Sequence, residues 1–169
     1  ERIRLSYASL STAGPESAYR YFALSADPDI IDVSIDIPSA CVVNIYPLMK
    51  GGELPDEDTL AKVLAAVSPD DVRPMTDQVS ALSPETVDYK IEIKYYCTKD
   101  DEAATIQTIE GDGGAIEQYI AWQQAALNRD INPDQLRRFV LAPSSGTGAA
   151  RIDVVSPVFS EVGKNQVAR

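Results

Sequence analysis

Alternating apolar and polar residues predict a β-hairpin in the first third of the chain. Over residues 31–37 every second residue is apolar and those between are polar, the pattern of a strand with one buried face. Residues 38–40 predict a short turn, and residues 41–46 predict the returning strand. The residues expected to face inward from the first strand are Ile31, Val33, Ile35 and Ile37.

Apolar residues at helical spacing then predict a helix and one further strand. The spacing within residues 60–67 gives one apolar face, behind an acidic first turn at residues 56–58. Residues 70–77 predict a connection and residues 78–82 a strand. The first unit is therefore expected to run strand, strand, helix, strand.

The longest alternation in the chain opens a second unit. Its charged residues should face water, as in the first hairpin. The residues expected to face inward are Val87, Tyr89, Ile91, Ile93 and Tyr95.

Apolar residues at helical spacing continue from about residue 100 to Asn128, across the glycines of residues 111–114. We interpret this stretch as one long helix, although three glycines in a helix interior cost about 2–3 kcal/mol relative to alanine. A phosphate-binding loop is the alternative, but no strand precedes it and no GK[ST] sequence follows it. Asn128 is expected in the left-handed conformation at the end of this helix.

The remaining residues complete the second unit. Asn132 and Pro133 predict the cap and first turn of another helix, residues 151–155 a last strand, and residues 161–169 an unfinished strand or tail. The expected fold class is α+β. It consists of two small α/β sandwich units, strand–strand–helix–strand and then strand–helix–helix–strand, with mostly antiparallel sheets and helices on one face.

A helix is also predicted within residues 13–30, before the first hairpin. Pro15 fits its first turn and Pro28 ends it, because the residue before a proline avoids the α region. Its expected buried face is Ala18, Tyr21, Phe22 and Ser25. Residues 1–12 predict an extended or irregular segment. The expected domains are residues 1–28 (connecting segment and helix), 29–84 (first unit) and 85–169 (second unit with a C-terminal tail).

Composition narrows the function classes. The 169 residues include 15 basic and 26 acidic side chains, and a net charge of −11 disfavours binding to nucleic acid. The absence of histidine excludes imidazole-based catalytic triads and most zinc sites. Cys41 and Cys97 are expected to be buried thiols in strands. The apolar runs are too short for a membrane span, and a chain that begins with Glu1 is expected to be an excised piece or processed product.

No group of residues predicts catalysis, a cofactor or a metal site. The acidic runs at 56–58, 70–71 and 100–102 lie at helix starts or loops, where the helix dipole accounts for them. None has the spacing of a calcium loop, and the serines of residues 144–148 have no base beside them. Trp122 and the tyrosines fit core or interface packing, or a platform for sugar rings.

Three stretches in order carry a resemblance to a known family. They are AGPESAYRYFALSADPDIIDVSI (residues 13–35), DDVRPMTDQVSAL running into VDYKIEIKYY, and IEQYIAWQQAALNRDINPDQLRRFV (residues 116–140) followed by ARIDVVSP. Together they resemble the baseplate J family of contractile phage tails, found in Mu-like and related phages and in related injection machines. The resemblance spans nearly the whole chain and places it in the C-terminal half of such a protein.

The resemblance implies a structural role in a tail baseplate, as a wedge protein assembled in the bacterial host cytoplasm. Its implied partners are other wedge and hub proteins and further copies in a ring, with no nucleic acid, membrane or small-molecule substrate. The residues expected to make these contacts are Tyr19, Tyr21, Phe22, Arg73, Trp122, Arg129 and Asp130. The alternatives are a tail-associated glycan hydrolase with two carboxylates in a cleft, and a host-surface binding module that uses the tyrosines and Trp122.

Overall fold

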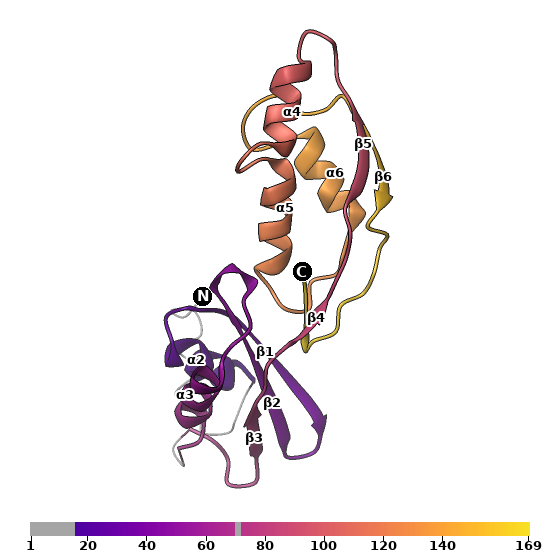
Figure 1. The fold of residues 1–169 in the computed structure, drawn as a ribbon. Helices are drawn as coiled ribbons and strands as arrows, with labels where there is room; N and C mark the ends of the chain where they lie inside the picture. Colours follow the sequence, from indigo (N-terminus) through magenta and orange to yellow (C-terminus); the bar gives the residue numbers. More distant parts are fainter. Residues whose placement is uncertain (1–15, 70–71) are drawn as a thin grey trace. The chain divides into compact units, whose positions relative to one another are not determined.

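The computed structural model describes residues 16–69 and 72–169, which divide into two compact units (Figure 1). The first contains the described residues up to Thr86, with residues 125–128 and 163–167. The second contains residues 87–124, 129–162 and 168–169. The predicted segment 1–12, Pro15 and the acidic pair 70–71 lie outside the described residues. The domain boundaries expected from the sequence, residues 29–84 and 85–169, stay a prediction.

The first unit is a three-stranded sheet with two helices. Its elements are α2 (Glu16–Ala26), β1 (Ile30–Ser39), β2 (Val42–Met49), the 3-10 turn η2 (Lys50–Gly52), α3 (Glu57–Val67) and β3 (Gln78–Ala81). The sheet order is β1-β2-β3, with β1 antiparallel and β3 parallel to β2. The β2–β3 pair is parallel because α3 connects the two strands as a crossover. The predicted α+β class and the order strand, strand, helix, strand are confirmed.

The inward face of β1 differs from the prediction at both ends. Val33 and Ile35 are buried as expected, but Ile31 is 38% exposed and Ile30 takes its place in the core. The register shifts between Ile30 and Asp32, and this bulge reverses the side-chain alternation at the start of the strand. Ile37 is 57% exposed close to the hairpin turn. The prediction is wrong for these two isoleucines.

The buried face of helix α2 matches the expected one only in part, since Ala18 is buried as predicted and Phe22 packs against the core. Tyr19 and Ala23 are buried in the core, whereas Tyr21 and Phe22 are half-buried and Ser25 is exposed. Apolar residues lie on several sides of this helix, so their spacing alone allows two faces, and packing against α3 and the sheet selects one. The residues of the resulting core are Tyr19, Ala23, Leu24, Ile30, Val33, Ile35, Val43, Ile45, Val63 and Val67.

Cys41 is not a buried strand residue. It lies in the two-residue turn between β1 and β2, with a φ of 63°, and its side chain is exposed. Cys97 is partly exposed. The prediction of buried thiols in strands is therefore wrong for both cysteines, because the turn at Cys41 falls one residue later than the sequence suggested and Cys97 follows the end of a strand at Tyr96.

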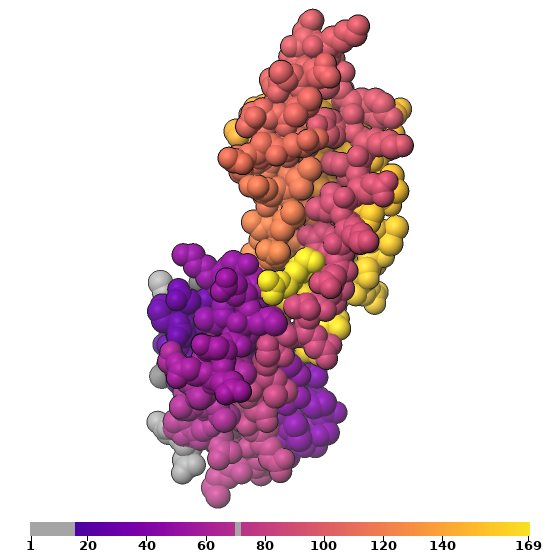
Figure 2. Space-filling view, viewed as in Figure 1, coloured from indigo at the N-terminus to yellow at the C-terminus, as the bar shows by residue number. Residues whose placement is uncertain are grey.

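The second part of the chain forms short strands and three helices. These are β4 (Glu85–Val87), β5 (Glu92–Tyr96), α4 (Glu102–Glu110), α5 (Ala115–Gln124), α6 (Pro133–Leu141), β6 (Arg151–Ser156) and β7 (Gln166–Ala168). Strand β4 pairs with β7, and β5 pairs antiparallel with β6. The predicted alternation is confirmed by burial from residue 87 to 97, and in Figure 2 this stretch runs along the surface of the second unit. The stretch forms two strands because its two halves have different partners.

The predicted single long helix is wrong. Helix α4 ends at Glu110 and α5 begins at Ala115. Gly111 is extended, with φ −71° and ψ 171°, and Gly113 has a φ of 69°, a left-handed value that glycine adopts without strain. The N–H of Gly114 donates to Gly111 O over 2.8 Å and closes the turn. The glycines therefore break the helix, and Asn128, left-handed as predicted with φ 54°, lies beyond the end of α5.

Helix α6 begins as predicted. The Asn132 side chain accepts a hydrogen bond from the N–H of Asp134 over 2.8 Å, and Pro133 occupies the first turn. Leu136 and Val140 are fully buried on its inner face. The core of the second unit consists of Ile109, Ala115, Tyr119, Leu136, Val140, Ala149 and Ile152.

Candidate interaction surfaces

The seven residues predicted to make subunit contacts fall into two groups. The first unit holds Tyr19, Tyr21, Phe22 and Arg73, and the second holds Trp122, Arg129 and Asp130. Their role in contacts with other proteins stays a prediction.

In the first group, Tyr19 and Arg73 hold the loop after α3. Tyr19 is 2% exposed, and its hydroxyl donates to Asp77 Oδ2 over 2.7 Å. Arg73 donates from Nη1 to Asp77 O over 2.7 Å and from Nε to Ser68 O over 2.8 Å. Burial, and then the Asp77 carboxylate, raise the pKa of Tyr19. Tyr19 is therefore a core residue here.

Tyr21 and Phe22 are the members of this group with accessible surface. Their ring centroids are 5.3 Å apart in an edge-to-face arrangement, and both side chains are half-buried. Phe22 packs against the core of the first unit, and the accessible part of this aromatic pair offers apolar area.

In the second group, Trp122 and Arg129 are in direct contact. The Arg129 guanidinium lies 4.2 Å from the centre of the indole ring and donates to the carbonyl oxygen of Trp122. The buried Gln123 donates to Arg129 O over 2.8 Å. Asp130 Oδ1 accepts from the N–H of Val162 over 3.0 Å. These bonds fix residues 129 and 130 against α5.

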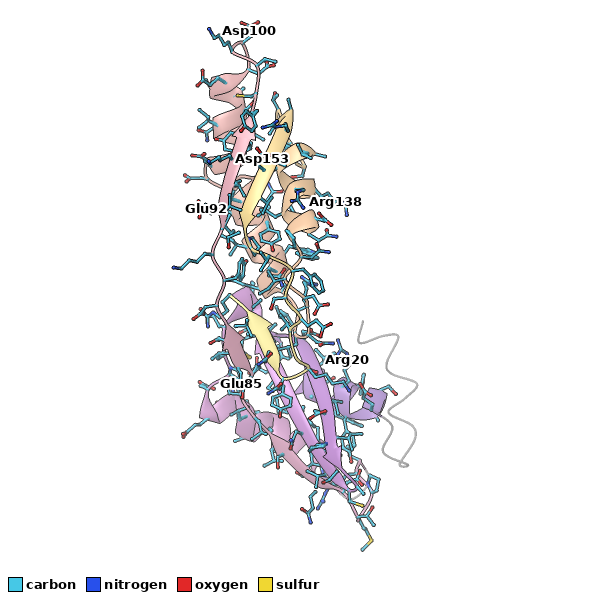
Figure 3. The ribbon with its side chains drawn as sticks, turned by 90° about the vertical axis from the view of Figure 1, so that its right-hand side faces the viewer. Arg20, Glu85, Glu92, Asp100, Arg138 and Asp153 are labelled. Atoms are coloured by element: carbon cyan, nitrogen blue, oxygen red, sulfur yellow. The ribbon has the colours of Figure 1, made fainter. Side chains whose placement is uncertain are left out.

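A hollow of about 370 Å³ lies between α5 and α6. Trp122 and Phe139, with ring centroids 6.1 Å apart, form its aromatic part. Arg138 is exposed on α6 beside it (Figure 3). The full lining is Gln118, Trp122, Gln135, Arg138, Phe139, Ala142 and Ser144. An aromatic floor with a polar rim suits an apolar side chain of a partner or a sugar ring. Sequence reasoning did not place Phe139 or Arg138 at a contact surface.

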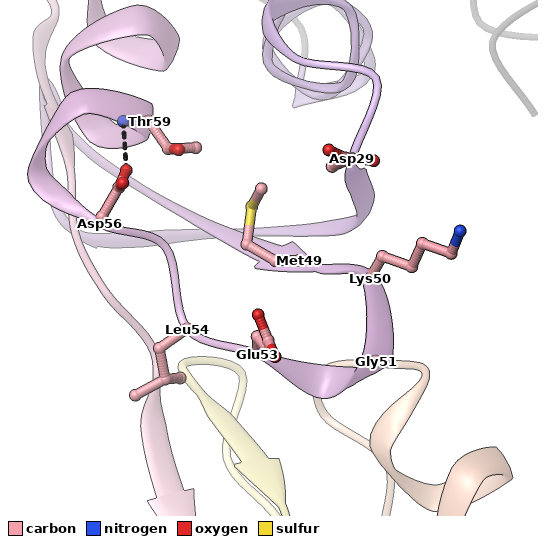
Figure 4. Close-up of a pocket in the computed structure, with 8 residues that line it drawn as sticks. All are labelled: Asp29, Met49, Lys50, Gly51, Glu53, Leu54, Asp56 and Thr59. Atoms are coloured by element: carbon pink, nitrogen blue, oxygen red, sulfur yellow. Dashed lines mark hydrogen bonds between the residues drawn. The ribbon is translucent and has the colours of Figure 1, made fainter.

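A second hollow, of about 530 Å³, lies in the first unit between the end of β2 and the start of α3 (Figure 4). Asp29, Glu53 and Asp56 line it together with Lys50. Asp56 caps α3, because its Oδ1 accepts from the N–H of Thr59 over 2.8 Å, and this bond lowers the pKa of the carboxyl group. A general acid needs the opposite shift.

A polar junction in the first unit was missed by sequence reasoning. Arg20 Nη2 lies 2.6 Å from Asp32 Oδ1, and Arg20 Nη1 donates to Val33 O. Asp32 Oδ2 accepts from the N–H of Leu127 over 3.0 Å. Asp32 therefore joins α2, β1 and residues 125–128, which lie far apart in the sequence.

Several apolar side chains are exposed on loops and strand ends. Met75 is 94% exposed, Val158 is 73% exposed and Phe159 is 57% exposed. Such residues are available for contacts between proteins. Within the described ranges 16–69 and 72–169, no helix has the length and apolarity needed to cross a bilayer, and no cluster of acidic and cysteine side chains could hold a metal ion.

Burial of Tyr119 predicts a pH effect on stability. Its hydroxyl is buried without a hydrogen-bond partner among the described residues, and burial, then Tyr89, raise its pKa to about 12. The folded state therefore keeps this proton up to about pH 12, whereas the unfolded chain loses it near pH 10. Stability should be unaffected by this group below pH 10 and should fall between pH 10 and 12.

Urea unfolding of the parent chain and of Tyr119→Phe between pH 7 and 12 measures this effect. Tyr119→Phe should cost little at pH 7, because no hydrogen bond is lost, and should flatten the alkaline decline. Tyr96→Phe, at a residue that is 45% exposed, is the control and should leave the decline unchanged. An equal decline in Tyr119→Phe and the parent would contradict the assignment.

The region that contains α2, the hairpin and α3 matches the model of a known protein family. Residues 11–83 match the Baseplate J-like central domain. The chain is also 32% identical, over 158 residues, to the baseplate protein J of Escherichia phage P2. That alignment covers 93% of this chain and 50% of the relative, so this chain spans about half the length of that protein. The predicted resemblance to the baseplate J family is confirmed.

A solved structure shares the fold. This chain matches a chain in the cryo-EM structure of the anti-feeding prophage baseplate, 6-fold symmetrised, with a TM-score of 0.60 at 12% sequence identity. The match covers 98% of this chain and 39% of the other. At this identity the likeness concerns the fold alone.

Proposed function

We propose that this chain is part of a structural protein of a contractile-tail baseplate, in a phage, a prophage or a related injection system. The observation that carries the proposal is the 32% identity to the phage P2 baseplate protein J over 93% of the chain. The fold likeness to a chain of the anti-feeding prophage baseplate supports it.

The proposed partners are other wedge and hub proteins of the baseplate, together with further copies in a ring. The protein would assemble in the bacterial host cytoplasm and remain in the virion tail. The hollow between α5 and α6, with Arg138 at its rim, is the contact surface that we favour. A net charge of −11 disfavours nucleic acid as a partner.

We also propose that the chain is not an enzyme. Of the carboxylates that sequence reasoning considered for hydrolysis, Asp56 caps α3, Asp58 pairs with Lys62 at 2.8 Å and Asp101 bonds Thr98 at 2.8 Å. These bonds supply structural reasons for the acidic runs. Neither the glycan hydrolase nor the host-surface binding module is favoured by a specific observation.

Complementation tests the proposal. Deletion of the gene for the full-length protein should leave phage or prophage particles without complete baseplates in electron micrographs, and the parent gene should restore them. Complete baseplates without the protein would overturn the proposal.

A pair of charge reversals on α6 tests the favoured surface in the same assay. Arg138→Glu should reduce the yield of complete baseplates at least several-fold. Arg137→Glu, on the same helix but outside the hollow, should not, because Arg137 pairs with Asp134 at 2.5 Å on an exposed face. Equal yields for both variants would exclude this hollow as the contact surface.

A further inference from the structure

The rim of the hollow between α5 and α6 carries an unpaired positive charge. Arg138 is the charged residue of its lining, and the Arg138 side chain makes no hydrogen bond or ion pair within residues 16–69 and 72–169. Gln135, three residues earlier on α6, also lines the hollow and therefore lies on the same side of the helix. The rim thus offers N–H donors to a carboxylate, the acceptor that an arginine side chain binds most strongly.

The floor of the hollow is aromatic and firmly packed. Trp122 and Phe139 both contact the fully buried Tyr119, whose ring centroid lies 6.2 Å from that of Trp122 and 6.0 Å from that of Phe139. The Arg129 guanidinium covers Trp122 at 4.2 Å from the ring centre. Rings held in this way lose little conformational freedom when a further aromatic side chain packs on them.

A second surface of the same unit carries the complementary groups. Phe159 is 57% exposed, the most exposed aromatic side chain among residues 16–69 and 72–169, and Val158 beside it is 73% exposed. Glu161 is also exposed, and in the described ranges its carboxylate makes no hydrogen bond or ion pair. An exposed aromatic ring therefore lies two residues from an unpaired carboxylate.

Backbone hydrogen bonds hold this second surface in place. The N–H of Ser160 donates to Ile131 O over 3.1 Å, and the N–H of Ile131 donates to Ser160 O over 2.9 Å. The two residues form an antiparallel bridge, in which the backbone is extended. Residues two apart in an extended backbone face the same side, so Phe159 and Glu161 project together.

We propose that residues 158–161 of one copy dock in the hollow between α5 and α6 of a second copy of this chain. The Phe159 ring packs on the aromatic floor, and the Glu161 carboxylate accepts hydrogen bonds from the Arg138 guanidinium. The contact joins two different surfaces, so it is heterologous and closes a ring where the rotation between copies allows. The inference rests on the proposed function, in which copies are neighbours in a baseplate, and names the residues that join them.

A second copy is favoured over a sugar because both halves of the contact are present on this chain. A neutral sugar ring would cover the aromatic floor but leave Arg138 without a counter-charge. Docking of a second copy pairs Arg138 with Glu161 and also removes Phe159 from water, which is favourable for an exposed apolar ring.

Sedimentation of charge-reversed variants, alone and mixed, tests the contact. The parent chain should associate at concentrations up to about 1 mM, the effective concentration of neighbours in an assembly. Arg138→Glu and Glu161→Arg should each weaken this association by roughly fivefold or more. The equimolar mixture of the two variants should associate again, because the reversed charges then meet across the contact. Arg137→Glu, outside the hollow, is the control and should change the association by less than about twofold.

The fluorescence of Trp122 gives a second readout. Trp122 is the only tryptophan in the sequence, so its emission reports on the hollow directly. Association should shift this emission to shorter wavelength, because a docked phenyl ring excludes water from the indole. Phe159→Ala should remove both the shift and the association, as expected for an aromatic anchor. Circular dichroism checks that this variant keeps its fold.

Association of the mixture, together with its loss in Phe159→Ala, supports the proposal. A parent chain that stays monomeric, a mixture that associates no better than its components, or unchanged association of Phe159→Ala would overturn it. An emission shift caused by N-acetylglucosamine and not by association would assign the hollow to a sugar and would also overturn it.

Failure of this contact and failure of the proposed function give different results. The sedimentation and fluorescence measurements use the isolated chain, so a negative result there leaves the outcome of complementation standing. Complete baseplates in the deletion strain would instead overturn the proposed function, and the contact between copies would still be measured in solution.

Discussion

Gly114→Ala is expected to destabilise the chain by about 2–3 kcal/mol in urea unfolding. The new Cβ would lie 2.6 Å from Gly111 O and 2.8 Å from Ile109 O. Both contacts are with backbone atoms, and Gly114 itself is buried, so neither atom can move aside without disturbing the junction of α4 and α5. If residues 102–124 formed one helix, the same change would instead stabilise it by about 1 kcal/mol.

Gly113→Ala is the matched control in the same turn. A Cβ at Gly113 meets nothing within 4 Å, so the only cost is the left-handed backbone with φ 69°. That cost is about 1 kcal/mol. If Gly114→Ala lowers the free energy of unfolding clearly more than Gly113→Ala does, the result supports a broken helix. Stabilisation by Gly114→Ala, with a gain in helical circular dichroism, would contradict it.

The spacing of apolar residues did not reveal the break between α4 and α5, because the break is four residues long, about one helical turn. Ile109, Ala115 and Tyr119 are all buried, so the four intervening residues return α5 to the core with its apolar residues in a plausible helical register. Periodicity reports which residues face the core, and it does so equally well for one helix or for two. Only the backbone of residues 111–114 distinguishes the two cases.

The strands show which features alternation can predict. The period of two follows directly from strand geometry, and it placed Val33, Ile35 and the whole of residues 87–95 correctly. It failed at Ile31, because a bulge adds one residue and no local signal marks it. It also could not tell that β4 and β5 have different partners, since the partner strands lie more than 50 positions further along the chain.

The candidate surfaces were predictable only in part. Trp122 and Arg129 lie close in the sequence, on either side of a helix end, and the structure brings them into contact. The residues that border the same hollow from α6, Phe139 and Arg138, could not be assigned to it without the packing of α5 on α6. Tyr19 was selected for its aromatic ring, but the ring's position on the helix buried it.

Asp32→Ala is expected to destabilise the first unit by about 2–4 kcal/mol. Asp32 Oδ1 lies 2.6 Å from Arg20 Nη2 and accepts from the N–H of Val33 over 2.9 Å, while Oδ2 accepts from the N–H of Leu127 over 3.0 Å. Its side chain is only 15% exposed, so water replaces these bonds poorly. Asp32→Asn should lose less stability, since an amide oxygen can still accept one of these hydrogen bonds.

Asp36→Ala provides the control on the same strand and the same outward face of the predicted hairpin. It removes an equal charge and an equal number of atoms, and no hydrogen bond or ion pair of the Asp36 side chain occurs within residues 16–69 and 72–169. Its cost should stay within about 0.5 kcal/mol. Chemical unfolding followed by circular dichroism measures both variants. Comparable losses would mean that Asp32 acts through strand propensity or net charge, and that its bonds to Arg20 and Leu127 contribute little to the first unit.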